Sequence, residues 1–104
     1  MSIVVLGVNY HTSPVTLLEK VMIPVPAMSE ALRVLSSHSD IREVIVLSTC
    51  NRTEVYAVAE RFHAAHTDIL EFLCETSGLS ADEITPHLYS QFDDDAVVHL
   101  FEVA

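Results

Sequence analysis

Residues 41–59 carry the pattern that most constrains how this chain can fold. Residues 44–47 (VIVL) form an unbroken apolar run, which is typical of a strand covered on both faces. Cys50, Asn51 and Arg52 follow almost at once, and asparagine tolerates turn conformations well. Residues 53–59 then alternate between an apolar face and a face that includes Glu54 and Tyr56. We therefore predict a hairpin with strands at 41–49 and 53–59 and its tip at residues 50–52.

Apolar periodicity predicts the other elements of the fold. The expected strands are residues 2–10 and 88–92, and the expected helices are 15–21, 27–37, 62–76 and a last helix that begins at residue 93. Without the short helix at 15–21, the order of elements is that of the split βαβ arrangement. We predict an α+β, ferredoxin-like βαββαβ sandwich, in which an antiparallel sheet has helices on one face and a final helix leads out.

Local signals predict where the helices begin and end. Ser13 is expected to cap the helix at 15–21, with Pro14 at its first position. Gly78 is expected to end the long helix, and residues 80–83 (SADE) resemble a capping box. Asp93 is expected to cap the last helix. That helix reaches the end of the chain with no glycine or proline stop signal, so we expect a fragment of a longer protein.

The charge balance limits the partners of this chain. Asp and Glu number 15 against 5 Lys and Arg, and the formal net charge of −10 opposes contact with nucleic acid. Hydrophobic residues make up 50% of the 104 residues, which is enough to bury a core. No apolar run approaches the roughly 20 residues of a membrane span, and no basic residue precedes the first apolar stretch. We predict a cytoplasmic protein with no membrane contact.

Two cysteines are predicted to be free thiols, because nothing suggests export and the core needs no disulfide. Cys50 lies at the hairpin tip two residues before Arg52, and a nearby guanidinium favours the nucleophilic thiolate. The alternative is that Cys50 is a buried cysteine acting as a small hydrophobic residue. Cys74 lies within the long helix, beside its apolar stripe, and is expected to be structural.

The histidines raise the question of a metal site. His63 and His66 share one helical face, but no third or fourth ligand is spaced to join them, so we predict no metal. His99 is expected to point away from the apolar face of the last helix, either into solvent or into a cleft. That predicted apolar face consists of Val97, Leu100, Phe101 and Ala104. With only two glycines, the chain also has no loop to cradle the phosphates of a nucleotide.

Three segments together resemble one family. GVNYHTSPV at residues 7–15 resembles the opening motif of glutamyl-tRNA reductase, and LSTCNRTEVY at residues 47–56 resembles its catalytic-cysteine motif. HLFEVA at residues 99–104 is similar to the family segment that follows. The resemblance extends over the whole chain, with the motifs in the family's order.

The resemblance implies an enzyme that converts glutamyl-tRNA and NADPH to glutamate-1-semialdehyde, the first step of five-carbon tetrapyrrole and haem biosynthesis. It implies a cytoplasmic homodimer with a downstream aminomutase as a possible partner. Residues 1–104 would be most of the N-terminal catalytic domain. The NADPH-binding and dimerisation domains would be absent from this chain, so we expect the chain alone to lack reductase activity.

The matching positions imply roles for individual residues. Cys50 would be the nucleophile that forms a thioester, and His99 would act near it in catalysis. Arg52 would bind the side-chain carboxylate of the substrate, since its planar fork can contact both oxygens. The remaining substrate-binding residues implied by the two motifs are Ser48, Thr49, Asn51, Asn9 and His11.

A second interpretation needs no catalysis. The small size, the acidity and the missing cofactor loop would also suit a non-catalytic, ferredoxin-like binding or regulatory module. The two interpretations differ in the reactivity of Cys50, which a catalytic domain needs and a binding module does not.

Overall fold

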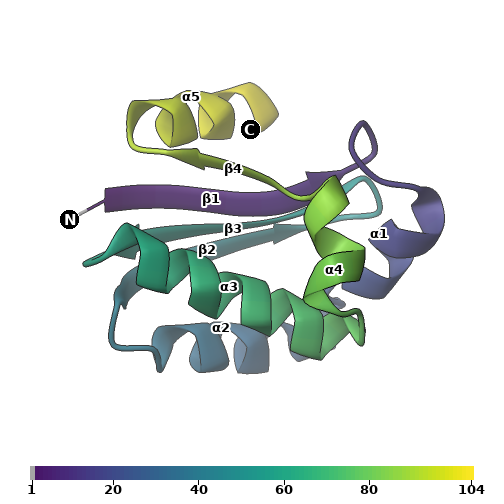
Figure 1. Ribbon diagram of the computed structural model, residues 1–104, viewed down its shortest axis with the longest axis horizontal. Coiled ribbons are helices and arrows are strands. Elements are labelled where there is room, and N and C mark those ends of the chain that lie inside the picture. The colour runs from purple at the N-terminus through teal and green to yellow at the C-terminus, as the bar shows by residue number, and fades with distance from the viewer. Residues whose placement is uncertain (1) are drawn as a thin grey trace.

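A four-stranded antiparallel sheet lies at the centre of the structure, a computed structural model that describes residues 2–104 (Figure 1). The strands are β1 (Ser2–Asn9), β2 (Ile41–Ser48), β3 (Arg52–Ala59) and β4 (Tyr89–Phe92), in the spatial order β2-β3-β1-β4. Because β3 lies antiparallel between β1 and β2, these two strands run in the same direction. This is the split βαβ topology, and the predicted ferredoxin-like fold is confirmed.

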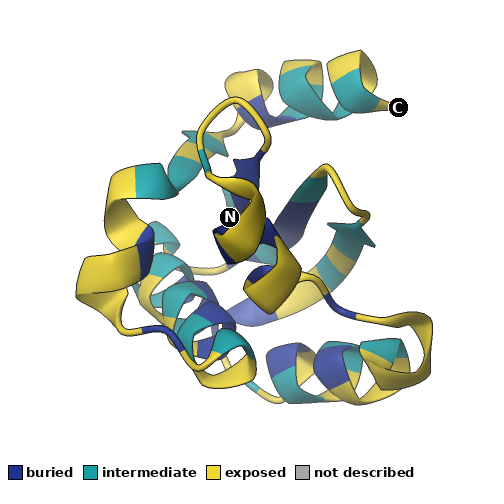
Figure 2. Ribbon diagram, turned by 90° about the vertical axis from the view of Figure 1, so that its right-hand side faces the viewer, coloured by how far each residue is buried: buried dark blue, intermediate teal, exposed yellow. Residues whose placement is uncertain are grey.

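The helices between the strands cover one face of the sheet (Figure 1). They are α1 (Val15–Val21), α2 (Met28–Ser36), α3 (Phe62–Ser77) and α4 (Ala81–Ile84), with 3-10 turns at Val25–Ala27 and Thr85–His87. Alternate side chains of β1 and β3 point to this face, among them Leu6 and Val55, and pack against Ile69 and Leu73 of α3. Figure 2 shows the buried residues on the strands and on the inner sides of these helices.

Helix α5 (Asp94–Val103) lies across the opposite face, over β4 and β1 (Figure 1). Ala96 is completely buried there against Val5 and Tyr56. The predicted apolar face of this helix does not face the sheet as a whole, because Phe101 is 77% exposed and His99 turns toward the sheet. The face through Ala96, His99 and Leu100 has the same helical spacing as the predicted one. Apolar periodicity alone did not indicate that the face with His99 packs on the sheet.

Strand β2 lies at the edge of the sheet, so the prediction that both its faces are covered is wrong. Its helix-facing side chains are partly buried, whereas Ile45 on the other face is 54% exposed. Helix α5 covers the middle and the β4 side of that face and stops short of β2. An apolar groove of about 170 Å³ lies between them, lined in part by Ile45, Tyr56, Val97 and Leu100.

Two of the four predicted helix ends are confirmed. Gly78 adopts a left-handed conformation at φ 76°, and Ser80 and Glu83 form the capping box. Ser13 does not cap α1, since Pro14 occupies the cap position and offers no side-chain bond. Asp93 occupies the cap position of α5, but its carboxylate accepts from the Ile3 N–H at 3.2 Å and not from the helix. None of the helices within residues 2–104 is long and apolar enough to cross a membrane.

Candidate functional site

Two loops that resemble family motifs meet at one end of the sheet. Asn9 at the end of β1 pairs with Arg52 at the start of β3, so the loop after β1 lies beside the β2–β3 turn. The Tyr10 N–H joins them directly by donating to the Asn51 carbonyl at 2.9 Å. Antiparallel pairing therefore places segments about forty positions apart in the sequence side by side.

Cys50 lies on the β2–β3 turn and is exposed. Thr49 and Asn51 are exposed on either side of it, and the Thr49 hydroxyl accepts from the Asn51 N–H at 3.1 Å. The second thiol, Cys74, is half-buried on α3, where burial and the charges of Glu71 and Glu75 raise its pKa. Both cysteines are free, and of the two Cys50 is the exposed one.

The loop after β1 is shaped by Asn9. Its side-chain carbonyl accepts from the N–H groups of His11 at 2.9 Å and Thr12 at 3.1 Å, while the Thr12 hydroxyl accepts from the Asn9 N–H at 3.0 Å. Asn9 is nearly buried, whereas His11 is exposed with its ring centroid 3.9 Å from that of Tyr10. The Asn9 side chain thus holds the loop, and His11 is exposed on it together with Tyr10 and Thr12.

Ser48 is turned away from these residues. Its hydroxyl accepts from the Ile23 N–H at 2.8 Å and lies 2.8 Å from the Thr53 hydroxyl, on the helix-covered face. These contacts tie the chain between α1 and α2 to the hairpin. The structure therefore brings Asn9, His11, Thr49, Cys50, Asn51 and Arg52 to one end of the sheet, with Ser48 beneath them.

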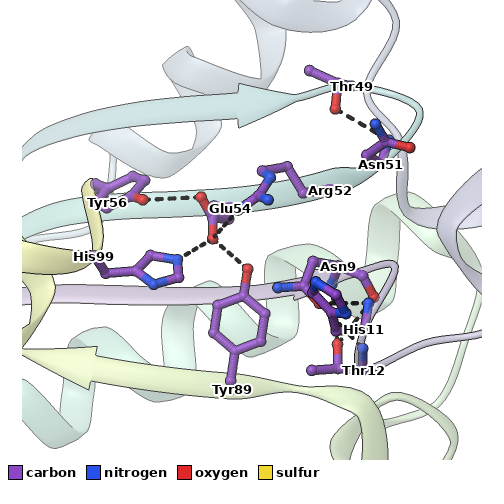
Figure 3. A network of polar contacts seen from close by, with 10 residues as sticks. All are labelled: Asn9, His11, Thr12, Thr49, Asn51, Arg52, Glu54, Tyr56, Tyr89 and His99. Atoms are coloured by element: carbon purple, nitrogen blue, oxygen red, sulfur yellow. Dashed lines mark hydrogen bonds and ion pairs between the residues drawn. The ribbon is translucent and has the colours of Figure 1, made fainter. Parts of the chain in front are cut away.

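A buried carboxylate lies next to Arg52, on the face covered by α5 (Figure 3). Glu54 of β3 is fully buried, and its Oε1 accepts from the Tyr56 hydroxyl at 2.9 Å. Its Oε2 contacts the Tyr89 hydroxyl and His99 Nε2, the latter at 2.5 Å, and lies 3.6 Å from Arg52 Nη1. We call Glu54, Tyr56, Tyr89 and His99 the Glu54 cluster.

The Glu54 cluster holds an ionised carboxylate inside the protein. Burial raises the pKa of Glu54, but the hydrogen bonds from Tyr89, His99 and Tyr56 outweigh that effect and hold this pKa below its usual value. Burial and the Glu54 carboxylate raise the pKa of both tyrosines, so both hydroxyls keep their protons and act as donors. Within residues 2–104, every buried side-chain polar atom has a hydrogen-bond partner.

The described residues hold neither a metal cluster nor a phosphate loop. No three His, Cys, Asp or Glu side chains between positions 2 and 104 are placed to share a metal ion. Gly7 is a packing residue, since a Cβ there would lie 2.7 Å from the Thr53 carbonyl oxygen and 2.8 Å from Glu54 Cγ. Gly78 ends α3. The two glycines therefore offer no cradle for a dinucleotide.

Comparison with known proteins gives a clear family assignment. The family model of the N-terminal domain of glutamyl-tRNA(Glu) reductase matches residues 6–104. The chain belongs to the glutamyl-tRNA reductase family. It is 42% identical over its full length to the glutamyl-tRNA reductase of Prochlorococcus marinus subsp. pastoris and 40% identical to that of Thermobifida fusca.

A solved glutamyl-tRNA reductase shares the fold. The structure from Methanopyrus kandleri superimposes with a TM-score of 0.67 at 27% identity, covering 97% of this chain and 21% of that one. This chain spans 24% of the Prochlorococcus relative and 22% of the Thermobifida one. The match therefore concerns about a quarter of a glutamyl-tRNA reductase.

The site residues predicted from the sequence do not include Glu54, Tyr56 or Tyr89. A signal for the first two exists, because an acidic residue and a tyrosine share one face of a strand that is otherwise apolar. Tyr89 carries no such signal, since its position depends on the pairing of β4 with β1. The open alternatives for His99 are resolved in favour of the interior, with its side chain 18% exposed and bonded to Glu54.

Proposed function

We propose that residues 1–104 form most of the N-terminal, thiol-bearing catalytic domain of a glutamyl-tRNA reductase. This enzyme would convert glutamyl-tRNA to glutamate-1-semialdehyde at the start of tetrapyrrole and haem biosynthesis. The observation that carries the proposal is the exposure of Cys50 on a turn beside Arg52, in a chain that belongs to this family. A structural cysteine would gain nothing from such a position.

The proposed first step is transfer of the glutamyl group to Cys50. The thiol loses its proton, and the thiolate attacks the carbonyl carbon of the ester that joins glutamate to the tRNA 3′ end. A carbon–sulfur bond forms, the ester carbon–oxygen bond breaks, and the 3′ oxygen leaves as a hydroxyl after taking up a proton. The turn gives this attack room, because Cys50 and both its neighbours are exposed.

The neighbouring side chains suit recognition of a glutamyl group. Arg52 is 23% exposed in its side chain and contacts Glu54 only at 3.6 Å, which leaves donors for the side-chain carboxylate of the substrate. The proposal assigns Thr49 and Asn51 to polar contacts at the turn, and Asn9 and His11 to the facing loop. Ser48 would contribute by holding the hairpin end in place. His99 would give or take a proton.

NADPH would bind outside this domain. The two glycines serve packing and helix termination, so the residues present do not fit a dinucleotide phosphate site. In the proposal NADPH supplies the two-electron reduction that releases the aldehyde, from a further domain of the longer protein. Homodimer contacts and hand-over of the product to an aminomutase belong to that longer, cytoplasmic protein as well.

The acidity of the domain bears on how the tRNA would be held. A net charge of −10 repels a polyanion, and only 5 of the 104 residues are Lys or Arg. The proposal therefore restricts the tRNA contact of this domain to the aminoacylated 3′ end, near Arg52. Basic contacts to the rest of the tRNA would come from other domains.

The test is a cysteine comparison in a full-length reductase that contains this domain. Cys50→Ser should lower NADPH oxidation driven by glutamyl-tRNA by at least about 100-fold, because an alcohol is a far weaker nucleophile than a thiolate at neutral pH. Cys74→Ser is the matched control and should keep most of the activity. Wild-type turnover by Cys50→Ser would refute the mechanism and favour the alternative, a non-catalytic binding module.

A further inference from the structure

We infer that Glu54 is a positioning residue that holds His99 with its proton on Nε2, leaving Nδ1 as the ring nitrogen able to exchange a proton with a ligand. Tyr89, which contacts the same carboxylate oxygen, assists it. The catalytic part of this inference rests on the proposed function, whereas the assignment of the proton concerns the chain by itself.

The direction of the hydrogen bonds determines the tautomer. An ionised carboxylate can only accept, so each of the three groups that form a hydrogen bond with Glu54 must donate to it. Tyr56 and Tyr89 donate their hydroxyl protons, and His99 must therefore carry a proton on Nε2. The bond from His99 Nε2 to Glu54 Oε2 is charge-assisted, because its acceptor is an ionised carboxylate.

The sheet leaves room for this arrangement at Gly7. Gly7 of β1 pairs with Glu54 on one side and with Tyr89 on the other, so the glycine lies between the two side chains that meet. A Cβ at this position would approach Glu54 Cγ to 2.8 Å. The missing side chain lets Tyr89 reach across β1 to the carboxylate, where its hydroxyl contacts Oε2, the same oxygen that lies near Arg52.

Few other charged groups face His99. From the sheet, Glu54 contacts it directly, Arg52 reaches it only through Glu54, and the Tyr56 and Tyr89 rings lie 6.5 and 5.4 Å away between centroids. On α5 itself, Asp95 and Glu102 are exposed. The Nε2 nitrogen of His99 is hydrogen-bonded to Glu54, whereas its Nδ1 nitrogen has no hydrogen-bond partner among the described residues.

This arrangement suits a proton-transfer step. If Nδ1 accepts the proton of the Cys50 thiol or returns one to the leaving 3′ oxygen, the ring passes through a cationic form. The Glu54 carboxylate stabilises that cation while keeping the ring in a single orientation. Because Arg52 is paired to the same oxygen, one buried carboxylate would hold both the proton-transfer group and the carboxylate-binding group.

The proton assignment can be tested by nitrogen-15 NMR of the 104-residue chain near neutral pH. We expect His99 to be protonated on Nε2, with a ring N–H proton that is far downfield and slow to exchange. Glu54→Gln should move this proton upfield, because a neutral amide is a weaker acceptor. Glu60→Gln, an isosteric change in an exposed ion pair with Arg42, is the control and should leave it unchanged.

Tyr89→Phe provides a second variant that keeps the carboxylate. Removing one donor from Oε2 should shorten the bond to His99 and move the same proton further downfield, whereas Tyr56→Phe, which acts on Oε1, should move it less. A proton on Nδ1 in the wild type, or a signal that both Glu54→Gln and Tyr89→Phe leave in place, would overturn the assignment.

Kinetics of the full-length reductase test the catalytic part. Glu54→Gln should lower kcat by at least about 10-fold, since losses on replacing such an orienting group run from about 10-fold for metal ligands to about 10⁴-fold for a reacting histidine. If Cys50→Ser retained activity, the proposed function would fail while the NMR assignment stood. If Cys50→Ser were inactive and Glu54→Gln turned over at the wild-type rate, the positioning role alone would be refuted.

Discussion

Asn9, the last residue of β1, lies directly opposite Arg52, the first residue of β3. This pairing places the loop after β1 beside the turn that carries Cys50. Because side chains alternate between the two faces of a sheet, a shift of one residue would turn Arg52 and Glu54 toward the helix-covered core. The candidate site therefore depends on the register of two central strands.

Gly7→Ala should both destabilise the chain and disturb the Glu54 cluster. The added methyl group meets the Thr53 carbonyl and Glu54 Cγ, so we expect a loss of about 1–3 kcal/mol in the free energy of unfolding. Gly78→Ala is the control. Its added methyl group would meet nothing within 4 Å, and the substitution should cost about 1 kcal/mol only because the backbone φ is 76°. Denaturant unfolding measures both losses, and the His99 ring N–H signal should move only in Gly7→Ala.

Glu54→Gln should destabilise the chain in a pH-dependent way. The pKa of Glu54 is lower in the folded chain than in the unfolded one, so its contribution is complete above the unfolded value of about 4.3 and is lost as pH falls toward the folded value. We expect a deficit of about 2 kcal/mol at pH 7 that shrinks below about pH 4. Urea unfolding of the wild type and of Glu54→Gln, at pH 7 and below about pH 4, measures this difference in the free energy of unfolding. A difference that does not change with pH would contradict the prediction.

Substitutions on α5 test which side of this helix faces the sheet. Ala96→Leu should cost about 1–3 kcal/mol, because Ala96 is fully buried against Val5 and Tyr56. Phe101→Ala should change stability by less than about 0.5 kcal/mol, because Phe101 is exposed. Thermal unfolding of the two variants would show the reverse order if the helix were rotated to bury Phe101.

The two thiols should differ in their rate of alkylation at neutral pH. Cys50 is exposed, whereas Cys74 is half-buried with a raised pKa, so we expect Cys50 to react at least about 10-fold faster. Single-cysteine variants, Cys74→Ser and Cys50→Ser, allow each rate to be followed by mass spectrometry. Equal and slow labelling of both would favour the binding-module alternative.

Ser48→Ala should affect stability more than substrate binding. Its hydroxyl accepts from the Ile23 N–H, and removing it leaves that donor without its partner at a cost of about 1–2 kcal/mol. Thr49→Ala, on the exposed turn, should cost less. A large rise in the KM for glutamyl-tRNA in full-length Ser48→Ala, with unchanged stability, would instead support direct contact with the substrate.

Much of the fold could be predicted because the hairpin and the long helix have unambiguous periodicity. Residues 53–59 alternate, the chain turns after β2 where expected, and Gly78 ends α3 as glycine commonly does. The exposure of Ile45 could not be foreseen. An apolar run shows only that a segment favours a β-strand. The position of β2 at the edge of the sheet follows from the pairing of the strands in the tertiary structure.

The candidate site was predictable in part for a similar reason. Cys50 and Arg52 are neighbours in the sequence, so their proximity needs only a turn. The meeting of Glu54 with Tyr89 and His99 joins three elements, β3, β4 and α5, and local pattern carries no information about such distances. The helical face that includes His99 looks unfavourable for burial until the carboxylate opposite it is known.

The sheet order also determines when the Glu54 cluster can form during protein synthesis. Strands β1, β2 and β3 are complete by residue 59, but β4 joins β1 only after residues 89–92 have been made. Until then Glu54 has neither Tyr89 nor His99, and one face of the sheet is uncovered. Contacts so distant in sequence form late in folding. In a nascent chain the turn with Cys50 and Arg52 is therefore complete before Glu54 has acquired its tyrosine and histidine partners from β4 and α5.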